Sequence, residues 1–398
     1  MKVLMLTPYL PFHPFSGGQT RAYNLIKNLS KKHEITLFSL IKDDEEKKNI
    51  KELEKYCSKI RVFKRSKTPW TLRNILKTGF GLYPFLVIRN LVPEEKEAVA
   101  KELSKEKYDL IHAETFYVMP HIPSTSIPIL MVEQTIEYSV YKHFVEDQAP
   151  FFTRPLLWID VLKLKYWETK IWKRADRVVA MSDSDRKSMN SLVPNLKIDI
   201  VPNGIDVEYF SKERLEVKGR PKVLYVGNFK WLQNVEAAQV LLREVFPKIL
   251  KKVPDAKLWI VGQYIPDEIK ANAGKDIQIT EAIPDMRDAY LNSTVLVTPI
   301  KGPGGTRLKI LEAMASALPV VTTSVGAEGL DVVDGKHALI SDDMDKLADL
   351  AIGVIKNKKL AIELGDRAKE FVIEHYRWQT SADLLDNIYK EAVKKGNG

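Results

Sequence analysis

Residues 294–321 read "TVLVTPIKGPGGTRLKILEAMASALPVV", and this stretch decides the fold. The apolar run 294–300 predicts a strand, and Thr306 to Ala317 predicts a helix with regularly spaced apolar side chains. A glycine-rich loop that contains Gly302, Gly304 and Gly305 lies between them. A strand, a glycine loop and a helix in this order are typical of α/β sheets that bind ligands beyond the carboxyl ends of their strands.

The same kind of strand recurs along the chain. The first half contains the runs "KVLMLTP", "HEITLFSL", "KIRVF", "DLIHAE", "IPILMVEQ", "DRVVAMS" and "KIDIVP". The second half contains "KVLYVGN", "KLWIVGQ", "IQITEA", "TVLVTPI", "PVVTTSV" and "HALIS". Nearly continuous apolar strands that alternate with helices predict parallel sheets covered on both faces. Two such series predict an α/β protein of two doubly wound, Rossmann-like domains that face each other across a cleft.

A weak internal repeat in the sequence indicates the domain boundary. The run "KVLMLT" at Lys2 and the run "KVLYVG" at Lys222 each lead through a loop to a helix and return by another strand. The hinge candidate is "VPNGIDVEYF", which holds Pro, Asn-Gly and Asp together. We therefore expect an N-terminal domain over 1–203, a C-terminal domain over 204–375, and a final amphipathic helix within 376–398 that packs back across the domains. Its apolar positions are Leu384, Leu385, Ile388 and Tyr389.

Length and composition agree with this organisation. A chain of 398 residues exceeds one ordinary core, and 45% apolar with 28% charged residues is typical of soluble proteins. The sequence has no apolar run of about 18 residues, so no membrane-spanning helix is expected. We interpret the opening "MKVLMLTPYLPF" as a strand and not a signal peptide. The single cysteine, Cys57, excludes an internal disulfide. We expect a cytoplasmic protein, with a peripheral position at the inner face of the membrane as an option.

The net charge of +9 is unevenly distributed. Between Arg61 and Pro93 stand seven Lys or Arg residues and no acid, interleaved with aromatic residues such as Trp70 and Phe80. Such a stretch suits an anionic membrane surface, or a solvated helix face over a core; nucleic acid is the weakest of the three and is not expected. The segment "FFTRPLLWIDVLKLKYWETKIWKRAD" predicts a helix that serves core packing or contacts a membrane or lipid-linked acceptor.

The glycine loop also indicates chemistry. Unpaired backbone N–H groups at a helix start bind anions, and Gly302, Gly304 and Gly305 would let a phosphate approach the backbone. Gly304, Gly305 and Thr306 are therefore donor-binding candidates. Arg307 and Lys309 add the charges that suit a diphosphate. Glu312 can accept hydrogen bonds from two adjacent sugar hydroxyls, and no Walker loop is present. These residues favour a nucleotide sugar over ATP; the alternative is a capped helix with surface charges.

The segment "GGTRLKILEAMASALPVVTT", with "GAEGL" downstream, resembles the donor site of retaining glycosyltransferases of family 4, which have the GT-B fold. The segments "PFSGGQTRAYNLIKNLSKKHEITL", "ADRVVAMSDSDRKSM", "VPNGIDVEYF" and "KVLYVGNFKWLQNVEAA" match in the expected order. A subgroup associated with surface-polysaccharide synthesis is most similar. The resemblance implies a nucleotide-sugar donor in the C-terminal domain, a glycan or lipid-linked acceptor in the N-terminal domain, retained anomeric configuration, and no metal or other cofactor. It also implies attack from the leaving-group face, without a protein nucleophile.

Several positions depart from the family pattern. The first of two glutamates that the family usually carries is replaced by Gly304, whereas Glu312 matches the second. The usual Arg and Lys after the second-domain "VG" are replaced by "GNFKWLQN". We expect Arg307 and Lys309 to supply the phosphate-binding charges instead. Gly227, Asn228 and, more weakly, Lys230 are the remaining donor candidates on this side.

In the N-terminal domain the resemblance places the donor phosphates close to Gly17, Gly18 and Arg21; the alternative is a plain turn with a surface arginine. Gln134 stands where the family often has a histidine, so it can bind sugar hydroxyls but cannot transfer protons. Glu133 or Glu137 could accept the acceptor's proton, or could be cap or surface carboxylates.

A metal site is not expected. Asp183-Ser-Asp185 has the spacing of a metal-binding motif in another glycosyltransferase fold, but Ser182 looks like an N-cap and the two acids belong to the first helical turn. The seven histidines show no metal-binding spacing. Two other classes stay open: a sugar-nucleotide 2-epimerase of similar fold, and a non-catalytic homologue that binds nucleotide sugars or membranes.

Overall fold

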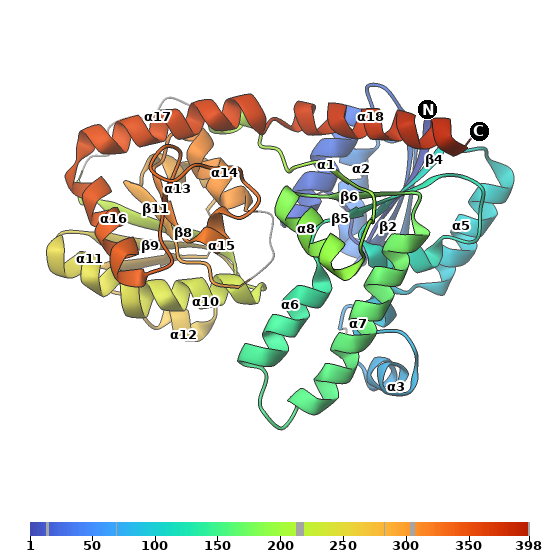
Figure 1. Cartoon of the computed structure of the whole chain (residues 1–398), viewed down its shortest axis with the longest axis horizontal. Helices are drawn as coiled ribbons and strands as arrows, with labels where there is room; N and C mark the ends of the chain where they lie inside the picture. The colour runs from blue at the N-terminus through green and yellow to red at the C-terminus, as the bar shows by residue number, and fades with distance from the viewer. Residues whose placement is uncertain (13–15, 69, 212–218, 282, 303–306, 397–398) are drawn as a thin grey trace. The chain divides into compact units, whose positions relative to one another are not determined.

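The computed structural model describes the chain except residues 13–15, 69, 212–218, 282, 303–306 and 397–398 (Figure 1). The described residues form two compact units. The first contains residues 1–203 and the segment from Trp378 onward. The second contains residues 204–302 and 307–377. The chain therefore leaves the first unit after Asn203 and returns to it at Trp378.

The first unit is built on a parallel sheet of seven strands in the order β3-β2-β1-β4-β5-β6-β7. All seven predicted runs form these strands, since each run is apolar enough to be buried on both faces. The strands are β1 (Lys2–Thr7), β2 (Glu34–Ile41), β3 (Lys59–Lys64), β4 (Leu110–Glu114), β5 (Ile129–Glu133), β6 (Arg177–Ala180) and β7 (Ile198–Ile200). Strand β1 pairs with both β2 and β4. Successive strands are added on one side of β1 up to β3 and on its other side from β4 onward, so the strand order reverses between β1 and β4.

Helices and turns connect these strands. They are α1 (Gly17–Leu29), η1 (Asp44–Asn49), α2 (Ile50–Leu53), α3 (Leu72–Phe80), α4 (Phe85–Asn90), α5 (Pro93–Lys105), η2 (Phe116–His121), α6 (Glu137–His143), η3 (Phe144–Gln148), α7 (Arg154–Arg174) and α8 (Asp183–Leu192). One core cluster joins Leu4 and Phe38 of the sheet to Val99 of α5 and Trp172 of α7. Trp172 is fully buried, so α7 packs on the sheet through its C-terminal half.

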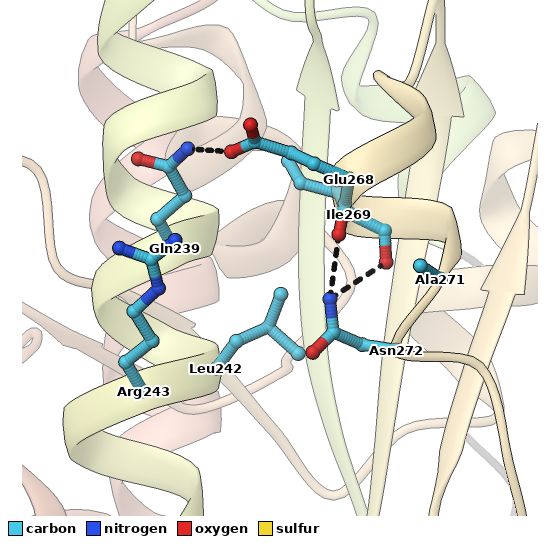
Figure 2. A pocket seen from close by; sticks show the side chains of 7 residues that line it. All are labelled: Gln239, Leu242, Arg243, Glu268, Ile269, Ala271 and Asn272. Carbon is cyan, nitrogen blue, oxygen red and sulfur yellow. Dashed lines mark hydrogen bonds between the residues drawn. The ribbon is translucent and has the colours of Figure 1, made fainter.

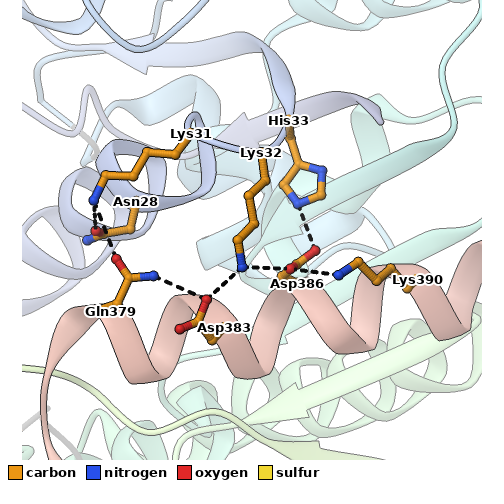
Figure 3. A network of polar contacts seen from close by, with 8 residues as sticks. All are labelled: Asn28, Lys31, Lys32, His33, Gln379, Asp383, Asp386 and Lys390. Atoms are coloured by element: carbon orange, nitrogen blue, oxygen red, sulfur yellow. Dashed lines mark hydrogen bonds and ion pairs between the residues drawn. The ribbon is translucent and has the colours of Figure 1, made fainter.

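The final helix, α18 (Trp378–Gly396), completes the first unit by packing on α1, β4 and β5. Of the four apolar positions named from the sequence, Leu385, Ile388 and Tyr389 are buried, whereas Leu384 is 40% exposed. A charged network anchors the helix (Figure 3). Asp386, which is 2% exposed, lies 3.0 Å from both His33 Nε2 and Lys32 Nζ and 2.9 Å from Lys390 Nζ.

The second unit has a parallel sheet of six strands in the order β10-β9-β8-β11-β12-β13. These strands confirm the six predicted runs: β8 (Lys222–Asn228), β9 (Lys257–Gln263), β10 (Ile277–Thr280), β11 (Val295–Thr298), β12 (Val320–Thr322) and β13 (Leu339–Ile340). Strand β8 pairs with both β9 and β11, so the strand order reverses between β8 and β11, as it does between β1 and β4 in the first unit. Gly262 is required in β9, because a Cβ there would lie 1.8 Å from the Gly227 carbonyl oxygen.

The helices of the second unit are α9 (Val207–Phe210), α10 (Leu232–Val240), η4 (Leu241–Val245), α11 (Phe246–Lys252), α12 (Asp267–Lys270), α13 (Met286–Leu291), α14 (Leu308–Ala315), α15 (Ser324–Ala327), α16 (Met344–Lys356) and α17 (Lys358–His375). The core cluster joins Val223 and Tyr225 of β8 to helices on one face of the sheet, among them Leu241 of η4 and Leu347 of α16. None of the helices in the described ranges is long and apolar enough to cross a membrane.

One predicted helix has different ends. The prediction placed Arg307 in the first turn of a helix over 306–317, whereas α14 begins at Leu308 and ends at Ala315. Arg307 precedes the helix and has a left-handed backbone, with φ of 53°. A non-glycine residue in this conformation is strained, and such residues concentrate at functional sites.

Candidate functional site

Two predicted donor residues of the second unit, Asn228 and Lys309, are linked through Asn234 beside strand β8. Lys309 of α14 donates to Asn234 Oδ1 over 2.6 Å, and its Nζ lies 4.7 Å from the centre of the Tyr225 ring. Asn234 in turn donates to the Asn228 carbonyl over 2.7 Å. Ligands in doubly wound sheets bind at the point where the strand order reverses. The structure thus brings together Asn228 at the end of β8 and Lys309, which stand 81 positions apart in the sequence.

The electrostatics of Lys309 are unusual. Burial, followed by the repulsion of Arg307, lowers the pKa of Lys309 to about 7, although Glu312 partly opposes the shift. Arg307 is itself buried, with 8% of its surface exposed. Arg307 and Lys309 repel each other, so a bound anion would stabilise the charged form of both side chains. Without an anion, about half of the Lys309 side chains are neutral at pH 7.

Glu312 lies one turn further along α14. Its Oε2 accepts a hydrogen bond from Tyr290 Oη over 2.6 Å. Burial raises the pKa of Glu312, whereas the Tyr290 hydrogen bond and the charge of Lys309 act in the opposite direction. Within the described ranges only Oε2 of this carboxylate takes a hydrogen bond, so Oε1 could accept hydrogen bonds from a ligand's hydroxyls. Lys309 and Glu312 therefore stand on one helix, α14, and Arg307 comes immediately before it.

The other donor candidates of this unit have separate roles in the structure. Gly227 packs against Asn234, whose Cβ would lie 3.2 Å from a Cβ at position 227. The exposed Lys230 is directed to the ring of Tyr264, 3.5 Å from its centre, where it forms a cation–π contact. Gly304, Gly305 and Thr306 lie outside the described residues.

The first unit has a polar cluster at its own reversal point, between β1 and β4. Gly17 and Gly18 begin α1, which Ser16 caps by accepting the Gln19 N–H. Tyr9 donates to Gln134 Oε1 over 3.0 Å, and Gln134 donates to Glu114 Oε2 over 3.1 Å. A Cβ at Gly18 would lie 2.2 Å from Tyr9 Oη and 2.4 Å from Gln134 Oε1. The absence of a side chain at Gly18 therefore permits the contact that orients Gln134.

Arg21 is not the surface arginine of the alternative interpretation, because it is fully buried. It donates to the Pro202 carbonyl and to Asn203 Oδ1, each over 3.1 Å. Arg21 thus holds the segment at which the chain leaves the first unit. Its Nε and Nη2 atoms are buried without a hydrogen-bond partner among the described residues.

Glu114, at the end of β4, is a residue that the sequence analysis did not single out. Burial alone would raise the pKa of this carboxyl, but His112, Arg21 and Gln134 together lower it. His112 Nε2 lies 3.6 Å from Glu114 Oε1, and the Nδ1 atom of His112 is hydrogen-bonded to Tyr389 of α18. The next residue, Thr115, has φ of 73° and ψ of 154°, a backbone conformation that only glycine adopts readily. Backbone strain thus adjoins both reversal points.

The glutamates after β5 differ from one another. Glu133 is 2% exposed, accepts from Trp172 Nε1 over 2.7 Å, and has a pKa that burial and Glu168 raise well above its usual value. Glu168 caps α6 by accepting the N–H groups of Glu137 and Tyr138. Glu137 is partly exposed, and desolvation raises its pKa to about 7. A carboxylate with this pKa can accept a proton at neutral pH, so Glu137 is the better candidate base.

The Asp183-Ser-Asp185 motif has the predicted helix-start geometry. Ser182 accepts the Asp185 N–H over 3.1 Å, and Asp183 pairs with Arg186 and Lys187. Across the described ranges, no group of three or more His, Cys, Asp and Glu side chains is arranged to hold a metal ion. Whether the reaction needs a metal stays a prediction.

A separate hollow of about 310 Å³ lies between α10, η4 and α12 (Figure 2). Its lining includes Gln239, Arg243, Glu268 and Asn272. Gln239 and Glu268 are hydrogen-bonded to each other, and Asn272 donates to the Glu268 carbonyl. None of the predicted donor residues lines this hollow, so it is distinct from the site around Lys309.

Comparisons with known proteins identify the family of the chain. The family described as "Glycosyltransferase Family 4" matches residues 15–209, and the family "Glycosyl transferases group 1" matches residues 220–357. The chain belongs to the family 4 glycosyltransferases. Its two parallel-sheet units are the two Rossmann-like domains of the GT-B fold.

Individual relatives are distant. An uncharacterized 44.6 kDa protein in the cps region of Klebsiella pneumoniae is 23% identical over 98% of this chain and 99% of its own length. The phosphatidyl-myo-inositol mannosyltransferase of Mycolicibacterium smegmatis is 25% identical over 76% of each chain. Among solved structures, the sucrose-phosphate synthase of Thermosynechococcus elongatus has a TM-score of 0.73 at 18% identity and covers 98% of this chain and 99% of its own. Anabaena HepE in complex with UDP-glucose has a TM-score of 0.70 at 15% identity, over 98% of this chain and 100% of its own.

Proposed function

We propose that this glycosyltransferase moves a sugar from a nucleoside-diphosphate donor to a hydroxyl of a glycan or lipid-linked glycan, with retention of configuration. The observation that carries the proposal is the cluster of Arg307, Lys309 and Glu312 at the reversal point of the second unit. Anabaena HepE, solved with UDP-glucose, has a similar fold. The relative from a cps region and the lipid-modifying mannosyltransferase are consistent with a role in surface polysaccharide or glycolipid synthesis.

The donor's leaving group determines what the second unit must do. Breaking the bond between sugar and phosphate leaves additional negative charge on the nucleoside diphosphate. Arg307 and Lys309 would stabilise this charge, and a fixed cation is most effective where water is excluded. Binding of the diphosphate would also return the proton that Lys309 lacks in the free protein, so the cation would be complete when it is needed. Glu312 would hold the ribose hydroxyls through its free oxygen.

The acceptor hydroxyl must lose a proton as it attacks. Glu137 would accept this proton, since its pKa of about 7 leaves it about half ionised at neutral pH. Gln134, oriented by Tyr9 and Glu114, would hydrogen-bond a sugar hydroxyl. The donor's own phosphate oxygen is the second candidate for the proton, because the family resemblance implies attack from the leaving-group face.

The central experiment is a calorimetric binding screen with UDP-, GDP-, ADP- and dTDP-sugars. Wild type should bind one donor class. Lys309→Ala and Glu312→Ala should each weaken binding roughly 10- to 100-fold, because each removes a hydrogen bond to or from a charged group. Lys346→Ala and Glu363→Ala, which change exposed residues of α16 and α17, are the matched controls and should bind like wild type. Unchanged binding in both site variants would show that the donor lies elsewhere.

Turnover separates the function from its alternatives. With donor and a panel of acceptors, the product should keep the donor's anomeric configuration, which proton NMR of the new linkage reports. Inverted configuration would contradict retention. Rapid nucleotide release or sugar interconversion with donor alone would instead support an epimerase. Tight donor binding without turnover over a broad acceptor panel would support a non-catalytic homologue.

A further inference from the structure

The first unit exposes large apolar side chains in two separate segments. The segment around α3 exposes Trp70, Leu72, Ile75, Leu76, Phe80 and Leu82. The start of α7 and the turn before it expose Phe151, Phe152, Leu156, Ile159 and Leu162. We call the two segments together the apolar-cationic surface. Phe80 is 91% exposed and Leu82 is 81% exposed, values that leave almost the whole side chain in water.

Helix α3 leaves its apolar face largely uncovered by the described part of the chain. None of its nine residues is buried. Leu72, Ile75, Leu76 and Phe80 follow the spacing of one helical face. An ordinary surface helix buries such a face on its own core, whereas here the face is left to water. Exposed apolar faces of this size mark a binding surface, because exposure is otherwise unfavourable.

The two segments lie side by side. Lys163 of α7 donates to the Thr78 and Gly81 carbonyls at the end of α3, the latter over 2.7 Å. Trp167 Nε1 donates to the Leu82 carbonyl over 2.8 Å, and the Tyr83 ring stacks on Trp167 at 4.5 Å. Figure 1 shows α3 next to α7. These contacts fix the backbone of α3 and leave its apolar side chains free.

The charged side chains of α3 itself are all cationic. Residues 61–93 contain seven Lys or Arg and no Asp or Glu, although Lys64 and Lys67 pair with Asp44 and Asp43. Arg73 and Lys77 of α3 are exposed and stand four residues apart, beside the apolar face. The two acids of α7, Asp160 and Glu168, are buried and accept backbone N–H groups. Two exposed acids that precede Phe151 in the sequence, Glu146 and Asp147, are paired with Lys142 and His143 of α6.

We infer that the apolar-cationic surface docks the first unit on an anionic lipid bilayer. Aromatic and aliphatic side chains would enter the boundary between headgroups and acyl chains, while Arg73 and Lys77 would contact acidic headgroups. A protein partner could bury the apolar side chains. The cations beside them, Arg73 and Lys77, favour an anionic lipid surface over such a partner. The inference concerns binding and does not rest on the proposed transferase reaction.

The test is co-sedimentation of the full chain with vesicles, without any sugar substrate. One set contains phosphatidylcholine with roughly a third phosphatidylglycerol, and the other contains phosphatidylcholine alone. Wild type should sediment with the anionic vesicles and much less with the neutral ones. Replacing both cations, in Arg73→Gln with Lys77→Gln, should weaken binding about 25-fold, since each surface cation contributes roughly a five-fold factor.

A second variant tests the apolar contribution. Phe80→Ser with Leu82→Ser should weaken binding to anionic vesicles at least about ten-fold. The melting temperature should not change, because these side chains bury almost no surface. Matched controls in the second unit are Lys251→Gln with Lys252→Gln, and Ile362→Ser, whose side chain is 53% exposed. The controls should sediment like wild type.

Three outcomes would overturn the inference. Wild type that stays in solution with anionic vesicles would exclude lipid docking. Site variants that sediment like wild type would place the lipid contact elsewhere. A concentration-dependent dimer of wild type, abolished by Phe80→Ser with Leu82→Ser and accompanied by no vesicle binding, would show that a second copy of the chain covers the surface.

Discussion

Donor binding should depend on pH through Lys309. Its pKa of about 7 in the free protein results from burial and from the neighbouring Arg307. A bound diphosphate raises this pKa, because it favours the charged form. The charged fraction in the free protein is about one half at pH 7 and about one eleventh at pH 8. Affinity for the donor should therefore be constant well below pH 7 and fall about ten-fold per pH unit above pH 8.

Calorimetry tests this linkage directly. Titrations in two buffers of different ionisation enthalpy should reveal uptake of about half a proton per bound donor at pH 7 and almost none at pH 5.5. A nucleotide sugar is used because a free nucleoside diphosphate has a terminal phosphate that itself titrates near pH 6. Lys309→Arg is the matched control, since a guanidinium stays charged over the whole range. Its absolute affinity can differ, but its pH dependence should be nearly flat.

Two results would refute this reasoning. One is a wild-type affinity that does not change between pH 6 and pH 9. The other is the same slope in wild type and in Lys309→Arg, which would assign the titration to another group. Glu312 is the obvious second group, because burial raises its pKa. Its effect has the opposite sign, since raising the pH ionises Glu312 and improves its ability to accept hydroxyl hydrogen bonds.

Three further perturbations test the structure. Lys309→Met should raise the free energy of unfolding by about 1 kcal/mol at pH 6, because a buried cation is removed from beside Arg307. The folded-state pKa lies below the unfolded value of about 10.4, so this gain should shrink as the pH rises from 7 toward 10; a lower melting temperature at pH 6 would contradict it. Gly18→Ala would place a Cβ on Tyr9 and Gln134 and should reduce turnover roughly ten-fold, whereas Gly353→Ala, with no atom within 4 Å of its Cβ, should keep wild-type turnover. Asp386→Asn should destabilise the chain by about 2 kcal/mol in urea titrations at pH 7, against less than about 0.5 kcal/mol for the half-exposed Asp383→Asn. His33, Lys32 and Lys390 hold Asp386, and the two lysines keep the pKa of Asp386 below its usual value. The difference in stability between wild type and Asp386→Asn should therefore be present above pH 4 and be lost as the pH falls further. Equal effects of Asp386→Asn and Asp383→Asn would contradict the anchoring role of Asp386.

The sequence predicted the strands because a strand buried on both faces is an almost continuous apolar run. Such runs as "KVLMLTP" and "TVLVTPI" are local signals, and each formed a strand. The family resemblance was also carried by local motifs, and the family matches confirmed it. The capping role of Ser182 followed from its place before two acids, which the helix dipole favours.

Other features depend on contacts that no local pattern contains. Arg21 was open to interpretation as a surface residue, yet its partners, Pro202 and Asn203, lie more than 180 positions away. The partner of Lys309, Asn234, is 75 positions away, so neither its burial nor its pKa could be predicted from the helix alone. The left-handed backbone of Arg307 was missed for a different reason. Arginine has no preference for this conformation, so tertiary contacts must impose it.

The return of the chain to the first unit has a consequence for biosynthesis. The second unit, residues 204–302 and 307–377, lies in the sequence between the two parts of the first unit, so helix α18 is translated after it. The ribosome therefore releases the second unit while the first unit still lacks Tyr389, the partner of His112, and Asp386, the partner of His33. The unit translated first should thus be completed last, and a fragment that stops at residue 203 should be aggregation-prone. A circular permutant that joins the α18 sequence to the front of residues 1–203 would supply the missing helix in one continuous polypeptide.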